Sequence, residues 1–312
     1  MVILPRERPI KEYLLQAAIR RGFPEMKDEL VRIQQGLAGE QYVDRSWQDM
    51  QLDEEFYLLH DFSTDTHQID TLFVCEKFIL IVEIKNIAGR IDFDERCHQF
   101  TRTLENGNVQ GFRNPLDQVR RHQRFLRQLF PDLPVIYVIV LAHPKTIIGQ
   151  IPQNEPIIHC SGLEFYIRKL LTMHKARLST EQLQRLQNEL LQMHTISNPK
   201  LNIDKDKVRT GVLCKQCDYT TQMLFQYGRF ICPKCQIKDD GTMLQRAIED
   251  YSLLINEWIT NIQFRKFMRV NSIYAANRLL KKLNLSHKGD KKGRKYFISF
   301  KRNSQINLRS RK

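Results

Sequence analysis

HQIDTLFVCEKFILIVEIKN, residues 67–86, contains two apolar runs separated by the polar pair Glu76-Lys77. The second run, residues 78–82, is apolar at every position, which is typical of a strand that is buried on both faces. Glu83 and Lys85 follow at its end. Because the side chains of a strand alternate, these two residues point to one face of the sheet.

A hairpin about Glu76-Lys77 pairs residues whose numbers sum to 153, although Glu-Lys is a poor two-residue turn. This register sets Asp70 opposite Glu83, with Cβ atoms about 5 Å apart. Two carboxylates so close repel each other, and Mg²⁺ is normally held by such a pair together with waters and a phosphate. Lys85 could orient or deprotonate water or stabilise the phosphate, which suits metal-assisted phosphodiester hydrolysis. The alternative is a solvated strand end with a weak surface ion pair.

The residues around this segment predict an α/β domain with a mixed sheet that ends near residue 171. Residues 1–50 are expected to be helical, and a helix is expected to begin at Pro115. The run 134–142 is apolar on both faces, as in a central strand. Further strands are expected at 56–62, 69–75, 90–93 and 100–104.

The pattern Asp70-x12-Glu83-x-Lys85 resembles the core of the PD-(D/E)xK nucleases. More narrowly, residues 30–160 resemble the nuclease-related domain, NERD. The matching pieces are Gly36-Leu-Ala-Gly39-Glu40, His67-Gln-Ile-Asp70, Val82-Glu-Ile-Lys-Asn86, Gly89-Arg-Ile91 and Asn114-Pro115-x-x-Gln118-x4-Gln123. The resemblance implies a restriction-endonuclease-like α/β/α core and a nuclease that depends on Mg²⁺ or Mn²⁺.

The same resemblance gives roles to two flanking residues. Glu40 would bind the metal or order its water, and Gln118 would face the site from the helix after the hairpin. Without the resemblance, Glu40 is an ordinary acid on a helix surface. His67 lies three residues before Asp70 along a strand, on the opposite face, and is interpreted as structural.

A second motif is Cys214-x2-Cys217-x14-Cys232-x2-Cys235, which has the spacing of a zinc site. Four thiolates complete a closed tetrahedral site, so the zinc is expected to be structural. Two short strands around Gly228 predict a zinc ribbon, which depends on its metal for folding. A redox dithiol is the alternative.

The charge of the chain is uneven. From residue 200 to 312 there are 25 Lys and Arg against 9 Asp and Glu, while the first 199 residues hold 24 basic and 26 acidic residues. Such an asymmetry indicates a polyanionic partner, most often nucleic acid. A solubilising tail, or a solvated helical pair that packs on the nuclease domain, is the alternative.

Residues 260–299 predict a helix with Ile262 and Phe267 inward, a turn, a second helix over 273–283 and a basic hairpin. This order resembles a winged helix-turn-helix. We expect residues of the second helix to meet base edges and residues of the wing to meet phosphates. The candidate nucleic-acid ligands are Tyr274, Asn277, Arg278, Lys281, Lys288, Lys291, Lys292 and Arg294.

Taken together, the sequence predicts five parts. These are a nuclease-like domain at 1–172, a helical linker at 173–209, a zinc ribbon at 210–240, a basic module at 241–302 and a tail at 303–312. We expect a Mg²⁺-dependent nuclease that acts on DNA. A DNA-binding regulator with a relic nuclease domain and an RNA-processing enzyme are the alternatives. With 42% hydrophobic residues the chain can bury real cores. No long uncharged apolar run or signal sequence is expected, so the protein is placed in the cytoplasm.

Overall fold

The chain divides into two units, each built from segments that lie far apart in the sequence. The computed structural model describes residues 1–94, 96–196 and 198–300, without the side chain of Lys292. The N-terminal unit comprises Met1–Glu7 and Ile33–Ser197, and the C-terminal unit comprises Arg8–Arg32 and Asn198–Lys312. The expected tail at 303–312 lies outside the described residues. Among the helices that the structure describes, none has the length and apolar character that a membrane span requires.

Residues 8–32 belong to the C-terminal unit, whereas the sequence places them in the first domain. Ala17, Ala18 and Phe23 are buried in the hydrophobic core of the C-terminal unit. Arg20 and Arg21 both form ion pairs with Asp250, at 2.6 and 2.8 Å. These contacts join segments from opposite ends of the sequence, so no local pattern predicts them.

A six-stranded mixed sheet with the order β1-β2-β3-β4-β8-β10 forms the centre of the N-terminal unit. The pairs β2-β3 and β3-β4 are antiparallel, and the pairs β1-β2, β4-β8 and β8-β10 are parallel. The strands are β1 (Val2–Leu4), β2 (Phe56–Ser63), β3 (Gln68–Cys75), β4 (Ile79–Lys85), β8 (Val135–Leu141) and β10 (Ile157–His159).

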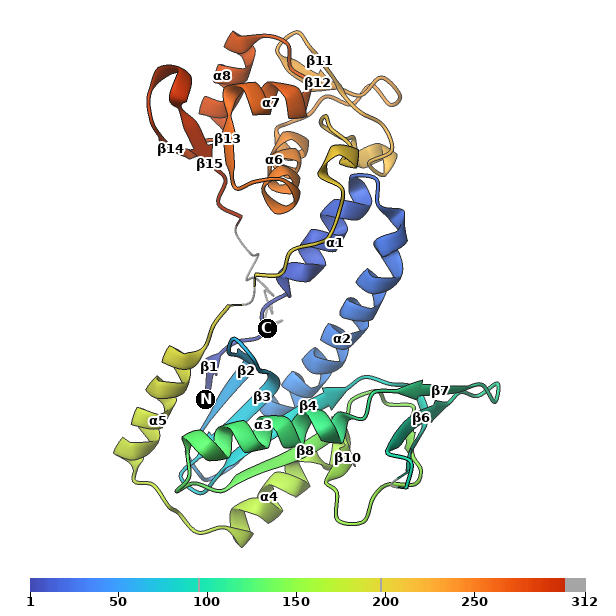
Figure 1. The fold of residues 1–312 in the computed structure, drawn as a ribbon, viewed down its shortest axis with the longest axis vertical. Helices are drawn as coiled ribbons and strands as arrows, with labels where there is room; N and C mark the ends of the chain where they lie inside the picture. The colour runs from blue at the N-terminus through green and yellow to red at the C-terminus, as the bar shows by residue number, and fades with distance from the viewer. Residues whose placement is uncertain (95, 197, 301–312) are drawn as a thin grey trace, which may run out of the picture. The chain divides into compact units, whose positions relative to one another are not determined.

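Helices cover both faces of this sheet and complete three layers (Figure 1). Val43, Trp47, Leu163 and Ile167 of α2 and α4 pack on one face. Leu126 of α3, with Leu183, Leu186 and Leu190 of α5, packs on the other. These helices are α2 (Lys27–Asp49), α3 (Pro115–Leu129), α4 (Leu163–Met173) and α5 (Thr180–Met193). The mixed α/β sandwich fits the nuclease-like core that the sequence predicts.

A smaller four-stranded sheet, of order β7-β6-β5-β9, extends from the same unit. It contains the strands expected at 90–93 and 100–104, together with one that returns after β8. Its members are β5 (Gly89–Asp94), β6 (Gln99–Thr103), β7 (Val109–Phe112) and β9 (Thr146–Ile148). Ile91, Phe93 and Phe100 bury against Leu116 and Val119 of α3.

One hydrophobic core unites the elements of the C-terminal unit. Cys214, Cys232 and Phe230 belong to the same buried cluster as residues of the C-terminal helices and of α1. The helices are α1 (Ile10–Arg20), α6 (Thr242–Leu254), α7 (Asn261–Met268) and α8 (Ile273–Lys282). The strands are β11 (Leu224–Gln226), β12 (Arg229–Ile231), β13 (Trp258–Thr260), β14 (Ser286–Lys288) and β15 (Lys295–Phe297). The segment expected as a separate zinc ribbon therefore shares its core with the basic module.

Helices α7 and α8 begin where capping residues satisfy their first N–H groups. Thr260 and Gln263 form a capping box at α7, and the side chain of Ser272 accepts from the N–H of Ala275 at α8. The inward face of α7 holds Phe264 and Phe267. The prediction that Ile262 points inward is wrong: its side chain is 70% exposed. A helix that begins at Asn261 turns its Phe264 and Phe267 toward the core and leaves Ile262 outside.

Candidate functional site

The β3-β4 hairpin has the register that the sequence predicts. Its last pair joins Thr71 with Val82, so Asp70 and Glu83 come next in the same register. The Asp70 carboxylate accepts a hydrogen bond at Oδ2 from the backbone N–H of Ile84, at 2.7 Å. This bond fixes the Asp70 side chain against the end of β4.

Contacts from the rest of the N-terminal unit hold the hairpin turn at Glu76-Lys77. The backbone N–H of Arg177 donates to the Glu76 carbonyl at 2.8 Å. The Lys77 ammonium donates to Glu54 at 2.9 Å and to the Leu171 carbonyl at 2.8 Å. Neither turn residue has a positive φ, which the favoured two-residue turns require. Contacts from other segments therefore stabilise this turn, which its own two residues do not favour.

Glu83 is buried at the end of β4 and forms an ion pair with the partly exposed Lys85. Glu83 is 0% exposed, and its Oε1 accepts a short hydrogen bond from the Lys85 ammonium. Its Oε2 has no hydrogen-bond partner among the described residues. Burial, together with the nearby charge of Asp70, raises the pKa of Glu83 to about 8 in spite of Lys85. A buried carboxylate oxygen without a partner is costly when ionised, and a cation would offset that cost.

Glu40 reaches the same place from α2. Burial and the charge of Asp70 raise the pKa of Glu40 to about 7, against the opposing effect of Arg6. Glu40 also contributes to the raised pKa of Glu83. The three acids named from the sequence thus share one electrostatic environment, although they come from a helix and two strands.

Two of these acids, Asp70 and Glu83, suit an ion that keeps part of its water. In the described part of the chain, the one group of three or more His, Cys, Asp or Glu side chains close enough to hold a metal by themselves is the four cysteines. Mg²⁺ keeps several waters and is held through one or two carboxylates. Asp70 and Glu83 could therefore hold a divalent ion together with water and a phosphate oxygen.

Three charged residues of this site have no place in the sequence prediction. Arg6 lies just after β1, Asp44 one helical turn after Glu40, and Asp61 opposite Asp70 in the register of β2 and β3. The i, i+4 spacing of Glu40 and Asp44 was a signal available in the sequence. Asp61 has a φ of 51°, which is unusual within a strand. Nothing local pointed to Arg6.

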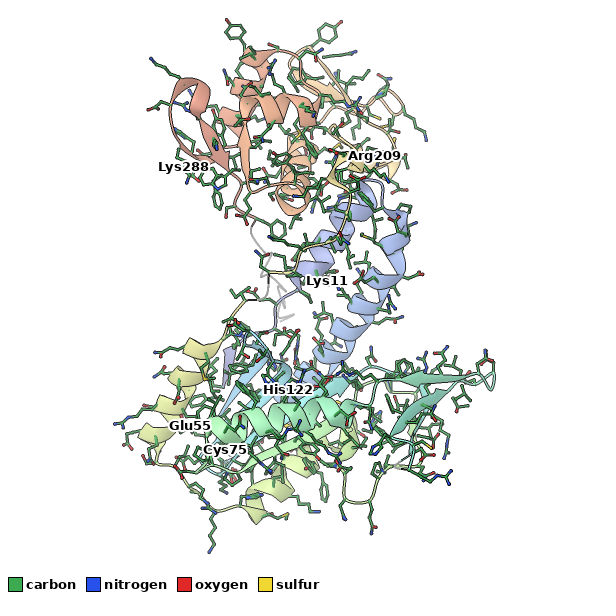
Figure 2. The ribbon with its side chains drawn as sticks, in the orientation of Figure 1. Lys11, Glu55, Cys75, His122, Arg209 and Lys288 are labelled. Carbon is green, nitrogen blue, oxygen red and sulfur yellow. The ribbon has the colours of Figure 1, made fainter. Side chains whose placement is uncertain are left out.

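The structure places Gln118 on α3, half-buried, where it makes no direct hydrogen bond to the acids among the described residues. One helical turn later, His122 is fully buried, and Figure 2 shows it on α3. Burial first, and then nearby charges that include Lys85, lower the pKa of His122 to about 4. Because residues four apart share a helix face, Gln118 lies on the same side of α3 as His122.

His67 contacts α3 rather than the acids. Its Nδ1 lies 2.9 Å from Nδ1 of His122, and its ring stacks on Phe125 with centroids 4.1 Å apart. This position agrees with the interpretation of His67 as a structural residue.

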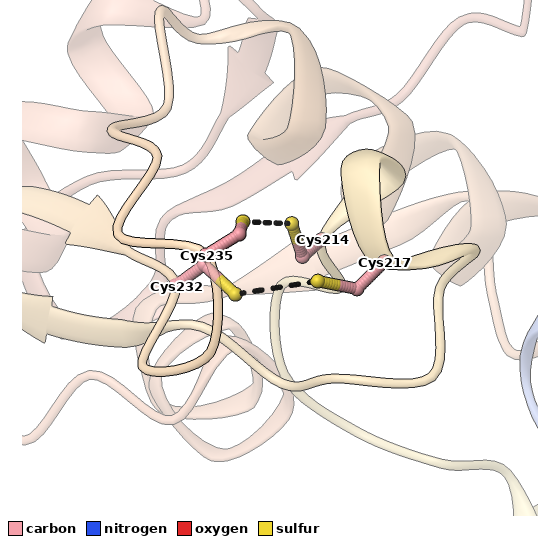
Figure 3. A group of neighbouring side chains, drawn as sticks. All are labelled: Cys214, Cys217, Cys232 and Cys235. Atoms are coloured by element: carbon pink, nitrogen blue, oxygen red, sulfur yellow. Dashed lines mark hydrogen bonds between the residues drawn. The ribbon is translucent and has the colours of Figure 1, made fainter.

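The four cysteines of the second motif converge in the C-terminal unit (Figure 3). The sulfur of Cys214 lies 3.6 Å from that of Cys235, and the sulfur of Cys217 lies 3.8 Å from that of Cys232. A tetrahedral zinc with Zn–S bonds of about 2.3 Å sets its sulfurs roughly 3.8 Å apart. The four thiols therefore fit a closed zinc site.

A short hairpin stands between the two cysteine pairs. Strands β11 and β12 are antiparallel, and Tyr227 and Gly228 at the turn both have positive φ values, 51° and 81°. These values suit a type I′ turn. Burial raises the pKa of Cys232, but backbone N–H groups of Cys235 and Lys234 that point at its sulfur outweigh this effect and lower the pKa to about 7. Donors aimed at a sulfur are suited to a thiolate.

The candidate nucleic-acid ligands on α8 are all exposed, but they differ in whether they already form hydrogen bonds within the chain. Tyr274 is 83% exposed, and Arg278 and Lys281 are also exposed. Asn277 is exposed too, but its Oδ1 accepts a hydrogen bond from Asn261 at 2.7 Å. Helix α8 therefore presents a basic and aromatic face to solvent.

Residues of the expected wing lie on and between β14 and β15. The ammonium of Lys288, labelled in Figure 2, lies 4.3 Å from the centre of the Trp258 ring. Arg294 lies 3.7 Å from Asp290 in an ion pair. Lys291 is exposed, and the side chain of Lys292 lies outside the described residues. Two of the three wing cations whose side chains the structure describes, Lys288 and Arg294, are thus already engaged within the chain.

Comparison with known proteins finds a family match within the N-terminal unit. Residues 35–142, from the middle of α2 to the residue after β8, match the family model of the nuclease-related domain. An uncharacterized protein of Bacillus anthracis is 28% identical over 137 residues, which cover 42% of this chain and 59% of that protein. The match therefore spans about three fifths of the relative's length. No solved structure matches. The segment that carries Glu40, Asp70, Glu83 and Lys85 is thus similar to nuclease-related domains.

Proposed function

We propose that the protein is a divalent-metal-dependent nuclease that hydrolyses phosphodiester bonds in DNA. The observation that carries the proposal is the meeting of Asp70, Glu83 and Lys85 at the end of one hairpin. The Asp70 carboxylate is fixed by the N–H of Ile84, and Glu83 keeps one buried oxygen without a partner among the described residues. These two acids would hold Mg²⁺ or Mn²⁺, which supplies a polarised water and neutralises charge on the phosphate.

Lys85 is assigned to the phosphate rather than to proton abstraction. Burial lowers its pKa, but the charges of Glu83 and Asp70 outweigh this effect, so the pKa is raised. Its side chain is 26% exposed, so a substrate can reach it. A protonated amine at this place stabilises negative charge that develops on the transferred phosphoryl group. Glu40 would order water beside the ion, and Gln118 would line the site from α3.

The C-terminal unit would bring DNA to the site. Helix α6, strand β13, helices α7 and α8 and the β14-β15 hairpin follow one another, and the sheet order is β13-β15-β14. This order resembles a winged helix-turn-helix, in which the last helix enters the major groove. Tyr274, Arg278 and Lys281 would contact DNA from α8, and Lys291 would contact the backbone. The structural zinc would fix the core on which these elements rest.

A cleavage assay tests the proposal. Purified full-length protein with Mg²⁺ or Mn²⁺ should nick supercoiled plasmid, and Asp70→Asn and Lys85→Ala should not. Asp65→Asn, an exposed acid of the preceding loop, is the matched control and should cleave like the wild type.

The alternatives give different results in the same assay. If neither the wild type nor the variants cleave DNA while all of them retard it on a gel, the protein is a DNA-binding regulator with a relic nuclease domain. Faster cleavage of RNA than of DNA would indicate an RNA-processing enzyme.

A further inference from the structure

Arg6 is the most completely enclosed cation of the N-terminal unit's site. Strand β1 pairs in parallel with β2 and brings the residues that follow it to the acids. The Arg6 side chain is only 4% exposed. It lies outside the segment that matches the nuclease-related domain, so neither the motif nor the match assigns it a role.

Every N–H group of the Arg6 guanidinium has a partner on another element. Nη1 donates to Glu40 at 2.9 Å and to Asp61 at 2.7 Å. Nε and Nη2 donate to the two oxygens of Asp44 at 2.8 and 3.3 Å. Nη2 also donates to the backbone carbonyl of Asp70 and to the Thr71 hydroxyl, both at 3.0 Å. One planar group therefore ties α2, β2 and β3 together.

Two of these partners belong to the proposed nuclease site. Arg6 holds the Glu40 carboxylate directly, and it holds the backbone of Asp70 while Ile84 holds the carboxylate of the same residue. The position of Glu40 relative to Asp70 thus depends on one guanidinium. Partners that orient the ligands of a metal site strongly affect how well the site binds its ion.

Arg6 also balances an excess of negative charge. The charged and titratable groups around it come from two strands and a helix: Glu40, Asp44, His60, Asp61 and Asp70. Burial lowers the pKa of His60 to about 4, so this ring contributes no positive charge at neutral pH. Arg6 is thus the cation that faces these acids from the end of β1.

We infer that Arg6 is a positioning residue of the nuclease site, which sets Glu40 and Asp70 in the arrangement that accepts a divalent ion. The inference rests on the proposed function. A lysine would keep the charge, but its single ammonium cannot reproduce the planar fork that reaches three elements at once. The contribution of the guanidinium geometry can therefore be separated from that of its positive charge by a substitution with lysine.

The test is Arg6→Lys in the full-length chain, with the Mg²⁺ concentration for half-maximal cleavage as the readout. We expect this concentration to rise on the order of 10- to 100-fold, as for other residues that orient metal ligands. A merely structural role would lower the fraction of active protein, and with it kcat, without moving the Mg²⁺ requirement. Arg168→Lys, an exposed arginine of α4 paired with Glu164, is the matched control and should behave like the wild type.

A second variant keeps the inference testable if Arg6→Lys does not fold. Asp61→Asn removes one charged partner from the same Nη1 of Arg6 that holds Glu40. This variant should also raise the Mg²⁺ requirement, by a smaller factor than Arg6→Lys. An unchanged Mg²⁺ requirement in the folded variants, with an active wild type, overturns the role of Arg6 alone. Mn²⁺ binding in the absence of DNA separates the role of Arg6 from the proposed nuclease function. This binding is measured by the loss of the free-ion signal in electron paramagnetic resonance. A wild type that neither cleaves nor binds Mn²⁺ overturns both.

Discussion

Four cysteine sulfurs of the C-terminal unit lie within 4.8 Å of one another, whereas the acids of the N-terminal unit are spread over α2, β3 and β4 and share their space with Lys85 and Arg6. The cysteines offer soft ligands and fill a tetrahedron, which leaves no position for water. The acids offer hard ligands, and two of them leave room for water and substrate. An ion would therefore stabilise the fold of the C-terminal unit, whereas in the N-terminal unit it would take part in the chemistry.

The largest effect should come from breaking the cysteine cluster. Cys232→Ser, or removal of zinc by a chelator, should unfold the C-terminal unit, because structural zinc contributes about 10–16 kcal/mol of apparent binding free energy. Cys214 and Cys232 lie in the same core as α6, α7 and α8, so the damage should spread beyond the ribbon.

Limited proteolysis with mass spectrometry would detect this unfolding of the C-terminal unit. Cuts should appear within residues 8–32 and 198–300, while 33–196 stays protected. Cys97→Ser, at an exposed cysteine of the N-terminal unit, is the control and should leave both units intact. Full protection of the C-terminal unit in Cys232→Ser would show that its core does not need the metal.

The next effect should come from removing the amine at the other centre. Lys85→Met should lower kcat by about 10²–10³-fold, the cost of losing one preorganised group that stabilises transition-state charge. Binding of DNA on a gel should not change, since the C-terminal unit is expected to provide most of the affinity. Lys145→Met, at an exposed lysine, is the control. If Lys85→Met loses DNA binding and keeps its turnover, the amine serves as an anchor.

A smaller effect is expected on the basic face of α8. The wild-type affinity for DNA should fall by roughly 10³-fold or more between 50 and 200 mM salt if six or more phosphates are contacted. Arg278→Ala and Lys281→Ala should each reduce the slope of log affinity against log salt by about 1 if they contact phosphates. Arg185→Ala, at an exposed arginine of α5, should leave the slope unchanged. A flat salt profile of the wild type would mean that this face is not where DNA binds.

The smallest effect should be a pH-dependent gain in stability from Mg²⁺. The raised pKa values of Glu83, about 8, and of Glu40, about 7, mean that the folded protein keeps protons that the unfolded chain releases above about 4.5. Without the ion, these two acids should therefore destabilise the fold progressively as the pH rises from about 4.5 to 8. Mg²⁺ favours the ionised forms, so it should raise the melting temperature more at pH 8.5 than at pH 6.

Differential scanning fluorimetry with and without MgCl₂ at both pH values would measure this difference. Glu83→Gln removes one of the two titrating carboxyl groups, so it should reduce the difference between the Mg²⁺ effects at pH 8.5 and pH 6. An equal gain at both pH values would place Mg²⁺ binding away from these acids.

The hairpin and the cysteines could be predicted because their signals are local. The apolar run 78–82 and the acids at its end determine the register of β3 and β4, and the two Cys-x2-Cys pairs are close neighbours in the sequence. Strand alternation and ligand spacing act over such short distances. Both centres thus carry strong signatures in the residue order alone.

What could not be predicted depends on contacts between distant segments. Arg6 reaches the acids because β1, at the start of the chain, pairs with β2, which follows only after two helices. Arg20 and Arg21 of the first helical segment bind Asp250 of α6. Ile262 stands in the first turn of a short helix, where an apolar residue can face solvent while Phe264 and Phe267 fill the buried face.

The passage of the chain between its two units has a practical consequence for anyone who wishes to study the N-terminal unit alone. The polypeptide leaves the N-terminal unit after Glu7 and re-enters it at Ile33, inside α2. A fragment trimmed to the recognisable family segment would keep Glu40, Asp70 and Glu83 but would lose Arg6, which holds Glu40 and the backbone of Asp70. An inactive fragment of this kind would say nothing about the intact protein, whereas a fragment in which a linker joins residues 1–7 to residue 33 would retain Arg6 beside the acids.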